Sequence, residues 1–195
     1  MDSTFRMTMN KIGSGSSAYE PVSVEKTKEV AEFHSGIKGY GATPLVSLEA
    51  AAKKVGLKQL LIKDESHRFG LNAFKGLGGS YAIAKVLCER FGLTPGKDTY
   101  ALLTSPSYAD KLKEITFATA TDGNHGRGVA WFATLLGCGA YVFLPKGSES
   151  ERVENIRALG AHAEVTDMNY DDTVRFVSKK ASENGWILVQ DTSWD

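Results

Sequence analysis

The strongest constraint on the fold is a regular alternation of strand-like and helix-like segments that begins at residue 115. Short apolar runs at 115–121, 140–144, 162–166 and 186–190 alternate with stretches of helical periodicity at 125–136, 148–159 and 170–183. Strands that alternate with helices form a parallel sheet with right-handed crossovers, and the helices cover its faces. We therefore predict an α/β fold, a three-layer αβα arrangement around a four-stranded parallel sheet.

The segments before residue 115 are less regular. We expect a loosely held arm over residues 1–22, and then a mixture of helices and short strands with residues 100–103 unassigned. The expected helices are 24–34, 48–55, one from Lys75 to about 91 and one from Ser105 toward Lys113, and the expected strands are 45–46 and 57–63. Serine caps are expected at Ser23 and Ser47, and Ser148 and Glu151 have the spacing of a capping box.

Composition excludes several classes of protein. The 195-residue chain carries 23 basic and 23 acidic residues, and this balance argues against nucleic acid as the main partner. No apolar run reaches the roughly 18 residues that a membrane span needs, and the N-terminus lacks the pattern of a signal peptide. Cys88 and Cys138 lie in apolar runs and are interpreted as core residues. We expect a cytoplasmic protein with no membrane partner and no metal.

One lysine, Lys75, lies in the glycine-rich stretch DESHRFGLNAFKGLGGS (64–80). It follows Phe74 at the point where a strand-like segment gives way to a helix-like one. Partial desolvation there favours the neutral amine that an imine-forming lysine needs. Because most lysines are ordinary surface residues, this stretch by itself predicts no catalytic role.

Two polar turns follow strands of the predicted sheet, TDGNH (121–125) and QDTSW (190–194). Ligands of parallel α/β sheets bind at the carboxyl ends of the strands. Gly123 allows close approach of the backbone to a ligand, and the helix that follows offers free N–H groups to an anion. Asn124 can donate a hydrogen bond to a ligand oxygen. A simple helix cap formed by Asp122 or Asn124 is the alternative.

Four motifs in order resemble the signature of fold type II pyridoxal-phosphate enzymes, the structural class of tryptophan synthase β. They are GATPL (41–45), AFKG (73–76), TDGNHG (121–126) and ALGA (158–161), and the resemblance covers about residues 40–195. Aspartate at position 122 in place of the usual serine, together with VQDTSW (189–194), makes the chain most similar to the diaminopropionate ammonia-lyase family. The resemblance implies pyridoxal 5′-phosphate as cofactor and a small amino-acid substrate, 2,3-diaminopropionate, which that family converts to pyruvate and ammonia.

The resemblance assigns cofactor and catalytic roles residue by residue. Lys75 is expected to form the Schiff base with the cofactor, Phe74 to pack beside the ring, and Asn124 to hydrogen-bond the phenolic oxygen. Asp122 lies at the position where serine racemase has a serine base that acts on the second face of the cofactor ring. Two catalytic bases, Lys75 and Asp122, would then serve the two enantiomers of the substrate.

Substrate binding is assigned by the same resemblance. The turn formed by Thr121, Asp122, Gly123 and His125 is expected to hold the substrate carboxylate, and Asp191 to face the substrate amine. For His125, a packing role at the start of a helix is the stronger alternative.

Members of the resembling family are about twice this length, and their phosphate-binding loop and the partner of the pyridine nitrogen are not found here. We expect residues 1–80 to form the N-terminal part of a larger, incomplete cofactor-binding domain, and 81–195 a smaller α/β domain. A homodimer, or pairing with a missing C-terminal half, is implied. Two alternatives remain open: a threonine or serine dehydratase-like enzyme, in which Asp122 is unexpected, and a noncatalytic fragment that binds no cofactor alone.

Overall fold

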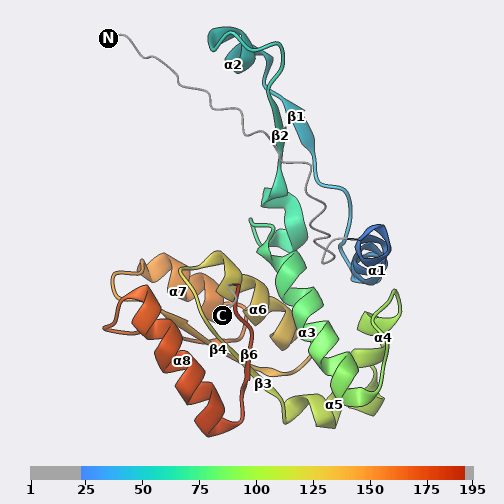
Figure 1. The fold of residues 1–195 in the computed structure, drawn as a ribbon, viewed down its shortest axis with the longest axis vertical. Coiled ribbons are helices and arrows are strands. Elements are labelled where there is room, and N and C mark those ends of the chain that lie inside the picture. Colours follow the sequence, from blue (N-terminus) through green and yellow to red (C-terminus); the bar gives the residue numbers. More distant parts are fainter. Residues whose placement is uncertain (1–22, 192–195) are drawn as a thin grey trace, which may run out of the picture.

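The computed structural model describes residues 23–191 and is built around a four-stranded parallel sheet (Figure 1). The strand order is β5-β4-β3-β6, and every neighbouring pair is parallel. The strands are β3 (Thr116–Ala120), β4 (Gly139–Leu144), β5 (His162–Val165) and β6 (Ile187–Leu188). The predicted strands and their parallel arrangement are confirmed, although β6 is shorter than its apolar run.

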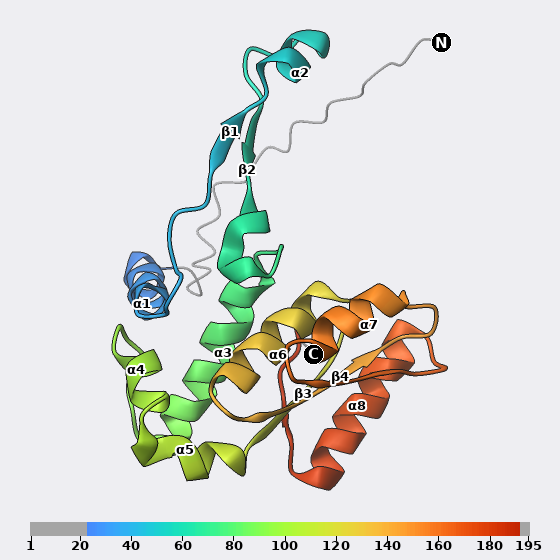
Figure 2. The same cartoon turned by 180° about the vertical axis from the view of Figure 1, so that it is seen from behind.

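Helices cover both faces of the sheet, which confirms the three-layer prediction. α6 (Asn124–Leu135) and α7 (Ser150–Arg157) lie on one face, and α8 (Tyr170–Asn184) lies on the other (Figures 1 and 2). α3 (Lys75–Phe91) packs against α6, and α1 (Val24–Ser35) packs against α3. This order brings the start of α3 close to the carboxyl end of the sheet.

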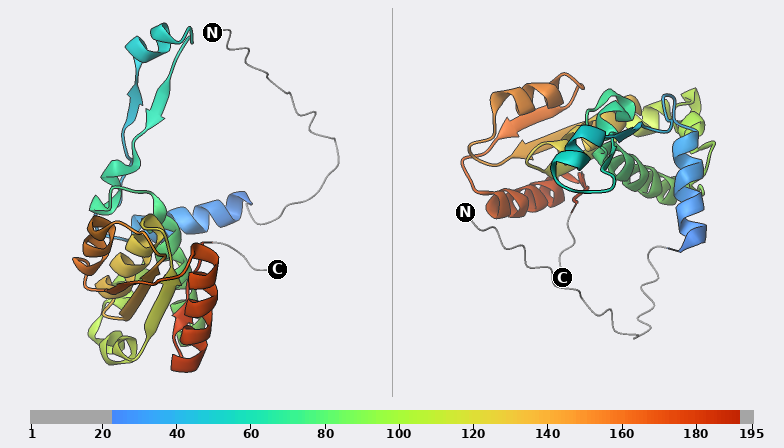
Figure 3. Two further views of the ribbon diagram at one scale, coloured as in Figure 1. Left: turned by 90° about the vertical axis from the view of Figure 1, so that its left-hand side faces the viewer. Right: turned by 90° about the horizontal axis from the view of Figure 1, so that it is seen from above.

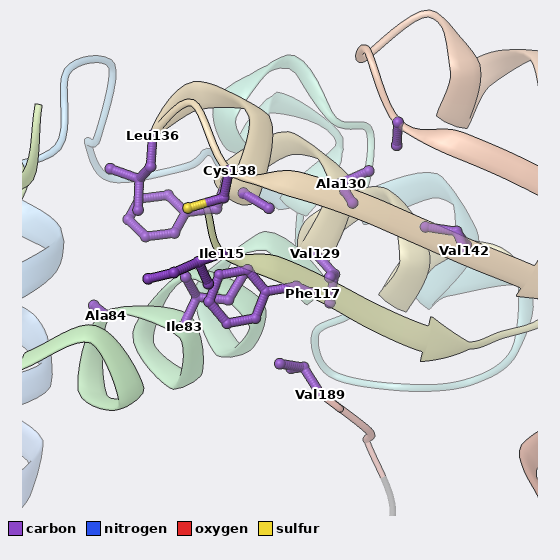
Figure 4. Close-up of a cluster of buried hydrophobic side chains, with 14 of the residues drawn as sticks. Ile83, Ala84, Ile115, Phe117, Val129, Ala130, Leu136, Cys138, Val142 and Val189 are labelled. Atoms are coloured by element: carbon purple, nitrogen blue, oxygen red, sulfur yellow. The ribbon is translucent and has the colours of Figure 1, made fainter. Parts of the chain in front are cut away.

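The main hydrophobic core lies between the sheet and the α3–α6 layer. Ile83, Phe117, Val129 and Val142 expose no surface, and they meet in the cluster of Figure 4. A smaller cluster under α8 contains Phe143 and Val177 among others. Cys88 and Cys138 are free and buried, so their interpretation as core residues is confirmed.

Helix starts follow the sequence signals only in part. Ser23 caps α1 as predicted, because its side chain accepts from the backbone N–H of Lys26. The capping box at Ser148 is wrong: the Ser148 hydroxyl donates to the carbonyl of Pro145 at 2.8 Å, and α7 begins two residues later. The serine cap of α2 (Glu49–Lys54) is also wrong, because Leu48 occupies the cap position. The unassigned segment is a helix, α4 (Thr99–Leu103), and α5 (Pro106–Lys113) follows it as predicted.

A two-stranded antiparallel ribbon projects from this body and carries α2 at its tip (Figures 1 and 3). Its strands are β1 (Leu45–Ser47) and β2 (Leu61–Lys63), both of which have exposed side chains throughout. The apolar side chains of Leu45, Val46, Leu61 and Ile62 are between 40% and 63% exposed. A ribbon with so much exposed apolar surface is typical of a segment that another part of a protein covers.

A polar network anchors the base of this ribbon to the 3-10 segment η2 (Glu65–Gly70). The buried Arg68 guanidinium donates to Glu65 at 2.8 Å and to the carbonyl of Gly41 at 2.7 Å, and the Thr43 hydroxyl donates to the same Glu65 carboxylate. These bonds from Arg68 and Thr43 lower the pKa of Glu65 to about 2. The carboxylate therefore stays charged near neutral pH and holds the Gly41–Thr43 backbone in place.

The contact between α3 and α6 depends on glycine. A Cβ atom at Gly128 would lie 2.7 Å from the backbone oxygen of Lys75, closer than real contacts allow. We expect Gly128→Ala to lower the free energy of unfolding by about 1–3 kcal/mol, the range for overpacked cores. Gly78→Ala is the matched control, because a Cβ there meets nothing within 4 Å and alanine favours a helix. Urea denaturation checks both variants, and equal stabilities would contradict this account.

Candidate active site

The structure places Lys75 at the first position of α3, beside the carboxyl end of β6. Its Nζ donates to Oδ2 of Asp191 at 2.6 Å, although the two residues are 116 positions apart. The side chains of Lys75 and Asp191 are 34% and 24% exposed, so the pair is open to a small ligand. Burial acts to raise the pKa of Asp191, but the hydrogen bond from Lys75 and the charges of His125 and Lys75 outweigh it and hold that pKa below its ordinary value.

A cavity of about 200 Å³ opens around this ion pair. It is largely apolar, and it brings together four residues that the sequence analysis singled out. These are Phe74, Lys75, His125 and Asp191, and the other lining residues are Gly78, Gly79, Ala82, Val189 and Gln190. Phe74 is 59% exposed, so its ring is free to lie along a ligand.

Thr121 holds the turn between β3 and α6 in shape. Its buried hydroxyl accepts from the backbone N–H groups of Gly123 at 3.0 Å and Gly126 at 3.1 Å. Gly123 has φ = +152°, a backbone conformation that residues other than glycine rarely adopt. Within residues 23–191 the N–H groups of Asn124 and His125 have no acceptor, so the turn presents two donors at a helix start.

His125 is buried and its ring is used within the fold. Its Nε2 lies 2.9 Å from the carbonyl oxygen of Val189, which ties the start of α6 to the strand that leads to Asp191. Thr121 is likewise engaged in the turn. The structure therefore gives both side chains a structural contact, while the backbone N–H of His125 stays free for a ligand.

Asp122 and Asn124 line a different cavity, of about 210 Å³, on the other side of the turn. Gly123 lines it too, together with Arg127, Arg152 and Asn155. Nη1 of Arg152 donates to the Asp122 carbonyl at 2.8 Å. The predicted site residues thus fall into two neighbouring groups, one around Lys75 and one around Asp122, with no lining residue in common.

Tyr170 and Arg152 near the site were missed by the sequence analysis, which named Gln190 only as part of the QDTSW turn, without a role. Gln190 accepts through Oε1 from the Thr119 hydroxyl at 2.7 Å and from the Ala120 N–H at 3.1 Å. Tyr170, the first residue of α8, has a raised pKa because of burial and of the charges on Asp191 and Asp122. Arg152 lies across the turn from α7. Tyr170 lies near the carboxyl end of a strand, so the rule that found Asp191 and Gln190 could also have found it.

The Lys75 cavity fits the cofactor that the motifs imply. It offers one primary amine for covalent attachment, a glycine wall at Gly78 and Gly79 for a flat ring, and the exposed ring of Phe74. The Nε2 of Gln190, another residue of this lining, is buried and has no partner among the described residues. No arginine lines it, and Lys75 is its one lysine, so the lining provides no second lysine or arginine for a phosphate.

Two further properties concern residues 23–191. No helix there combines the length and the apolar character needed to cross a bilayer. The same residues contain no group of three or more histidine, cysteine, aspartate or glutamate side chains placed to hold a metal ion.

Comparisons with known proteins show what the chain resembles. The chain is 51% identical over 173 residues to diaminopropionate ammonia-lyase of Escherichia coli strain K12. The match covers 89% of this chain and 42% of that protein. A crystal structure of the E. coli enzyme in complex with an aminoacrylate-PLP azomethine reaction intermediate superimposes with a TM-score of 0.78, over 88% of this chain and 42% of that chain at 51% identity. A catabolic L-threonine dehydratase of Staphylococcus aureus is 31% identical over 80 residues, which is 41% of this chain and 23% of that protein.

The chain therefore spans about two fifths of the length of the diaminopropionate ammonia-lyases that it matches. The family model described as pyridoxal-phosphate dependent enzyme matches residues 37–194. That range contains Lys75, the TDGNH turn and Asp191, the three features that build the Lys75 cavity and its neighbour. The chain belongs to the family of pyridoxal-phosphate dependent enzymes.

Proposed function

We propose that this chain is part of an ammonia-lyase that converts 2,3-diaminopropionate and water to pyruvate and two molecules of ammonia. The observation that carries the proposal is the 2.6 Å contact between Lys75 and Asp191 beside the TDGNH turn, in a chain 51% identical to diaminopropionate ammonia-lyases. Asp122 favours this reaction over that of a threonine or serine dehydratase, whose relatives carry serine at this point of the turn. The similarity to the dehydratase is also weaker and shorter.

Pyridoxal phosphate, when bound, supplies the electron sink for negative charge that develops on the substrate α-carbon. Lys75 would provide the amine that anchors the cofactor, Phe74 would pack beside its ring, and the side-chain amide of Asn124 would donate to its phenolic oxygen. The Asp191 carboxylate holds the Lys75 ammonium in this structure. Once Lys75 gives way to the substrate, the same carboxylate is free to face the substrate amine.

The TDGNH turn orients the substrate by its carboxylate. The N–H groups of Asn124 and His125, which have no acceptor within residues 23–191, point from a helix start where negative charge is favoured. Thr121 keeps these donors in place through its bonds to the turn. With carboxylate and amine both held, the α-hydrogen is directed at a base.

Two bases are proposed, one for each enantiomer. Lys75 removes the α-proton from one face and Asp122 from the other. The β-amino group leaves as ammonia and must be protonated as it departs. The remaining three-carbon product takes up water and releases the second ammonia, which leaves pyruvate.

We further propose that the projecting ribbon belongs to a second body. The expected division at residue 80 falls inside α3, and Phe33 from α1 lies in the main core. The part of the 1–80 region that stands apart is therefore the ribbon of β1, α2 and β2. Its exposed apolar side chains support contact with sequence that the longer relatives carry outside the match. We propose that the whole protein is a cytoplasmic homodimer that binds neither nucleic acid nor a membrane.

The test is an enzyme in which residues 23–191 replace the matching part of the E. coli relative. We expect it to release pyruvate from 2,3-diaminopropionate much faster than it releases a 2-oxo acid from serine or threonine. A preference for serine or threonine would establish the dehydratase instead. No product from any of the three, in a folded protein that takes up no cofactor, would favour the noncatalytic fragment.

A further inference from the structure

We propose that His34 is a positioning residue for Lys75: it fixes the first turn of α3 and so keeps the lysine amine at its place in the cavity. His34 lies in the last turn of α1, is 3% exposed and lines neither of the two cavities described above. The inference rests on the proposed function in one respect, the use of Lys75 as the attachment lysine.

The imidazole of His34 contacts the backbone of α3 close to its first residue. Its Nε2 lies 3.0 Å from the carbonyl oxygen of Leu77 and 3.3 Å from the hydroxyl oxygen of Ser80. Because a carbonyl oxygen can only accept, Nε2 carries the hydrogen and donates to Leu77. The Ser80 hydroxyl donates to the same carbonyl at 3.1 Å. Leu77 lies two residues after Lys75, so the bond from His34 holds the turn that carries the amine.

The first turn of α3 has little to hold it locally. Phe74 occupies the cap position, and its side chain makes no capping hydrogen bond. Three of the first five residues of α3 are glycines, and glycine weakens a helix relative to other residues. Contacts with other elements must therefore fix this turn. α6 supplies one of them at Gly128, and α1 supplies another at His34.

His34 is itself held by residues at the base of the ribbon. Its ring stacks on Tyr40, with 5.7 Å between the ring centroids and 21° between the planes. The Arg68 guanidinium carbon lies 5.2 Å from the centroid of the same Tyr40 ring. Burial lowers the pKa of His34, against the opposing effect of the Leu77 carbonyl, so the ring is neutral near neutral pH. One buried, neutral side chain thus joins the base of the ribbon to the start of α3.

The test measures how freely the Lys75 amine reacts in the 195-residue chain, without cofactor or substrate. The chain is treated briefly with an acylating reagent at fixed pH, and mass spectrometry of its peptides gives the ratio of Lys75 to Lys85 modification. Asp191 holds the Lys75 ammonium, whereas Lys85 is exposed on the same helix. We expect His34→Asn, whose shorter amide does not reach Leu77, to raise this ratio about fivefold, the factor that one ordinary hydrogen bond represents.

His34→Gln is the conservative variant, because its longer amide can donate to the Leu77 carbonyl from about the place of Nε2. It should remove most of the increase, a rescue that a space-filling role for the imidazole does not predict. His162→Asn is the matched control, since His162 is 54% exposed on β5 and should leave the ratio unchanged. Where thermal denaturation shows that His34→Asn does not fold, His34→Leu takes its place, because it removes the same donor with an apolar side chain.

A second readout comes from an active enzyme that contains this chain. There His34→Asn should lower kcat by a factor on the order of 10 to 10², because a small displacement of a reacting group costs that much. KM should change little, because the donors for the substrate carboxylate lie on α6.

An unchanged ratio of modification in His34→Asn would overturn the proposal, including the case in which Lys75 and Lys85 both react faster, since that shows a general loosening of α3. An equal increase in His34→Gln, or an unchanged kcat in His34→Asn, would also overturn it. The expected ratios in a protein that releases no pyruvate would count against the proposed function alone.

Discussion

Replacing Lys75 with alanine, in an active enzyme that contains this chain, is expected to abolish pyruvate formation from both enantiomers of 2,3-diaminopropionate. The lysine supplies the amine that anchors the cofactor and one of the two proposed bases, and no other lysine lines its cavity. Borohydride reduction followed by peptide mass mapping should place the cofactor on Lys75 in the unmodified enzyme. The same treatment should label no lysine in the variant.

Lys85→Ala is the matched control for that experiment. Lys85 lies on the same helix, is exposed, and is outside the cavity, so its loss should leave both turnover and labelling unchanged. Appreciable turnover in Lys75→Ala would remove Lys75 from its role and with it the assignment of the cavity.

Replacing Asp122 with asparagine is expected to separate the two enantiomers. The amide keeps the size of the side chain but cannot accept a proton, so turnover of the D-enantiomer should fall by a factor on the order of 10² or more, as for a lost general base. Turnover of the L-enantiomer, whose proton Lys75 can reach, should fall much less. Steady-state rates on each pure enantiomer make the comparison.

Asp110→Asn serves as the control, because the Asp110 side chain is 96% exposed on α5 and outside both cavities. If Asp122→Asn loses the same factor on both enantiomers, Asp122 only positions the substrate or the cofactor. The two-base mechanism would then have to be abandoned.

The sheet and its helices were predictable because their signals are local and repeated. Each strand is an apolar run, each helix has its own periodicity, and the connection rules leave few arrangements. Helix starts were less predictable, since a serine hydroxyl can either accept from a helix N–H or donate to a nearby carbonyl. Ser148 donates to the Pro145 carbonyl and leaves the start of α7 uncapped by its side chain.

The site was predictable as a set of residues but not as an arrangement. Sequence motifs pointed to Lys75, Asp122 and Asp191. No local signal predicts that Lys75 hydrogen-bonds to Asp191 or that Asp122 lines a different cavity. These relations arise from how α3 docks on α6 and from the register of β6 beside β3. They are properties of packing between distant segments, which a single sequence does not display.

The docking of α3 has a consequence for how such a protein can diverge. The proposed attachment lysine is the first residue of a helix whose later turns, at Ile83 and Leu87, are wholly buried in the core. Its first turn lies against the backbone of Gly128 with no room for another atom. A change of side-chain volume deep in the core therefore shifts the amine, and a change at the amine strains the core. Over evolutionary time, substitutions along α3 should persist only with compensating changes in α6. The position of the proposed catalytic amine and the packing of the core would therefore change together.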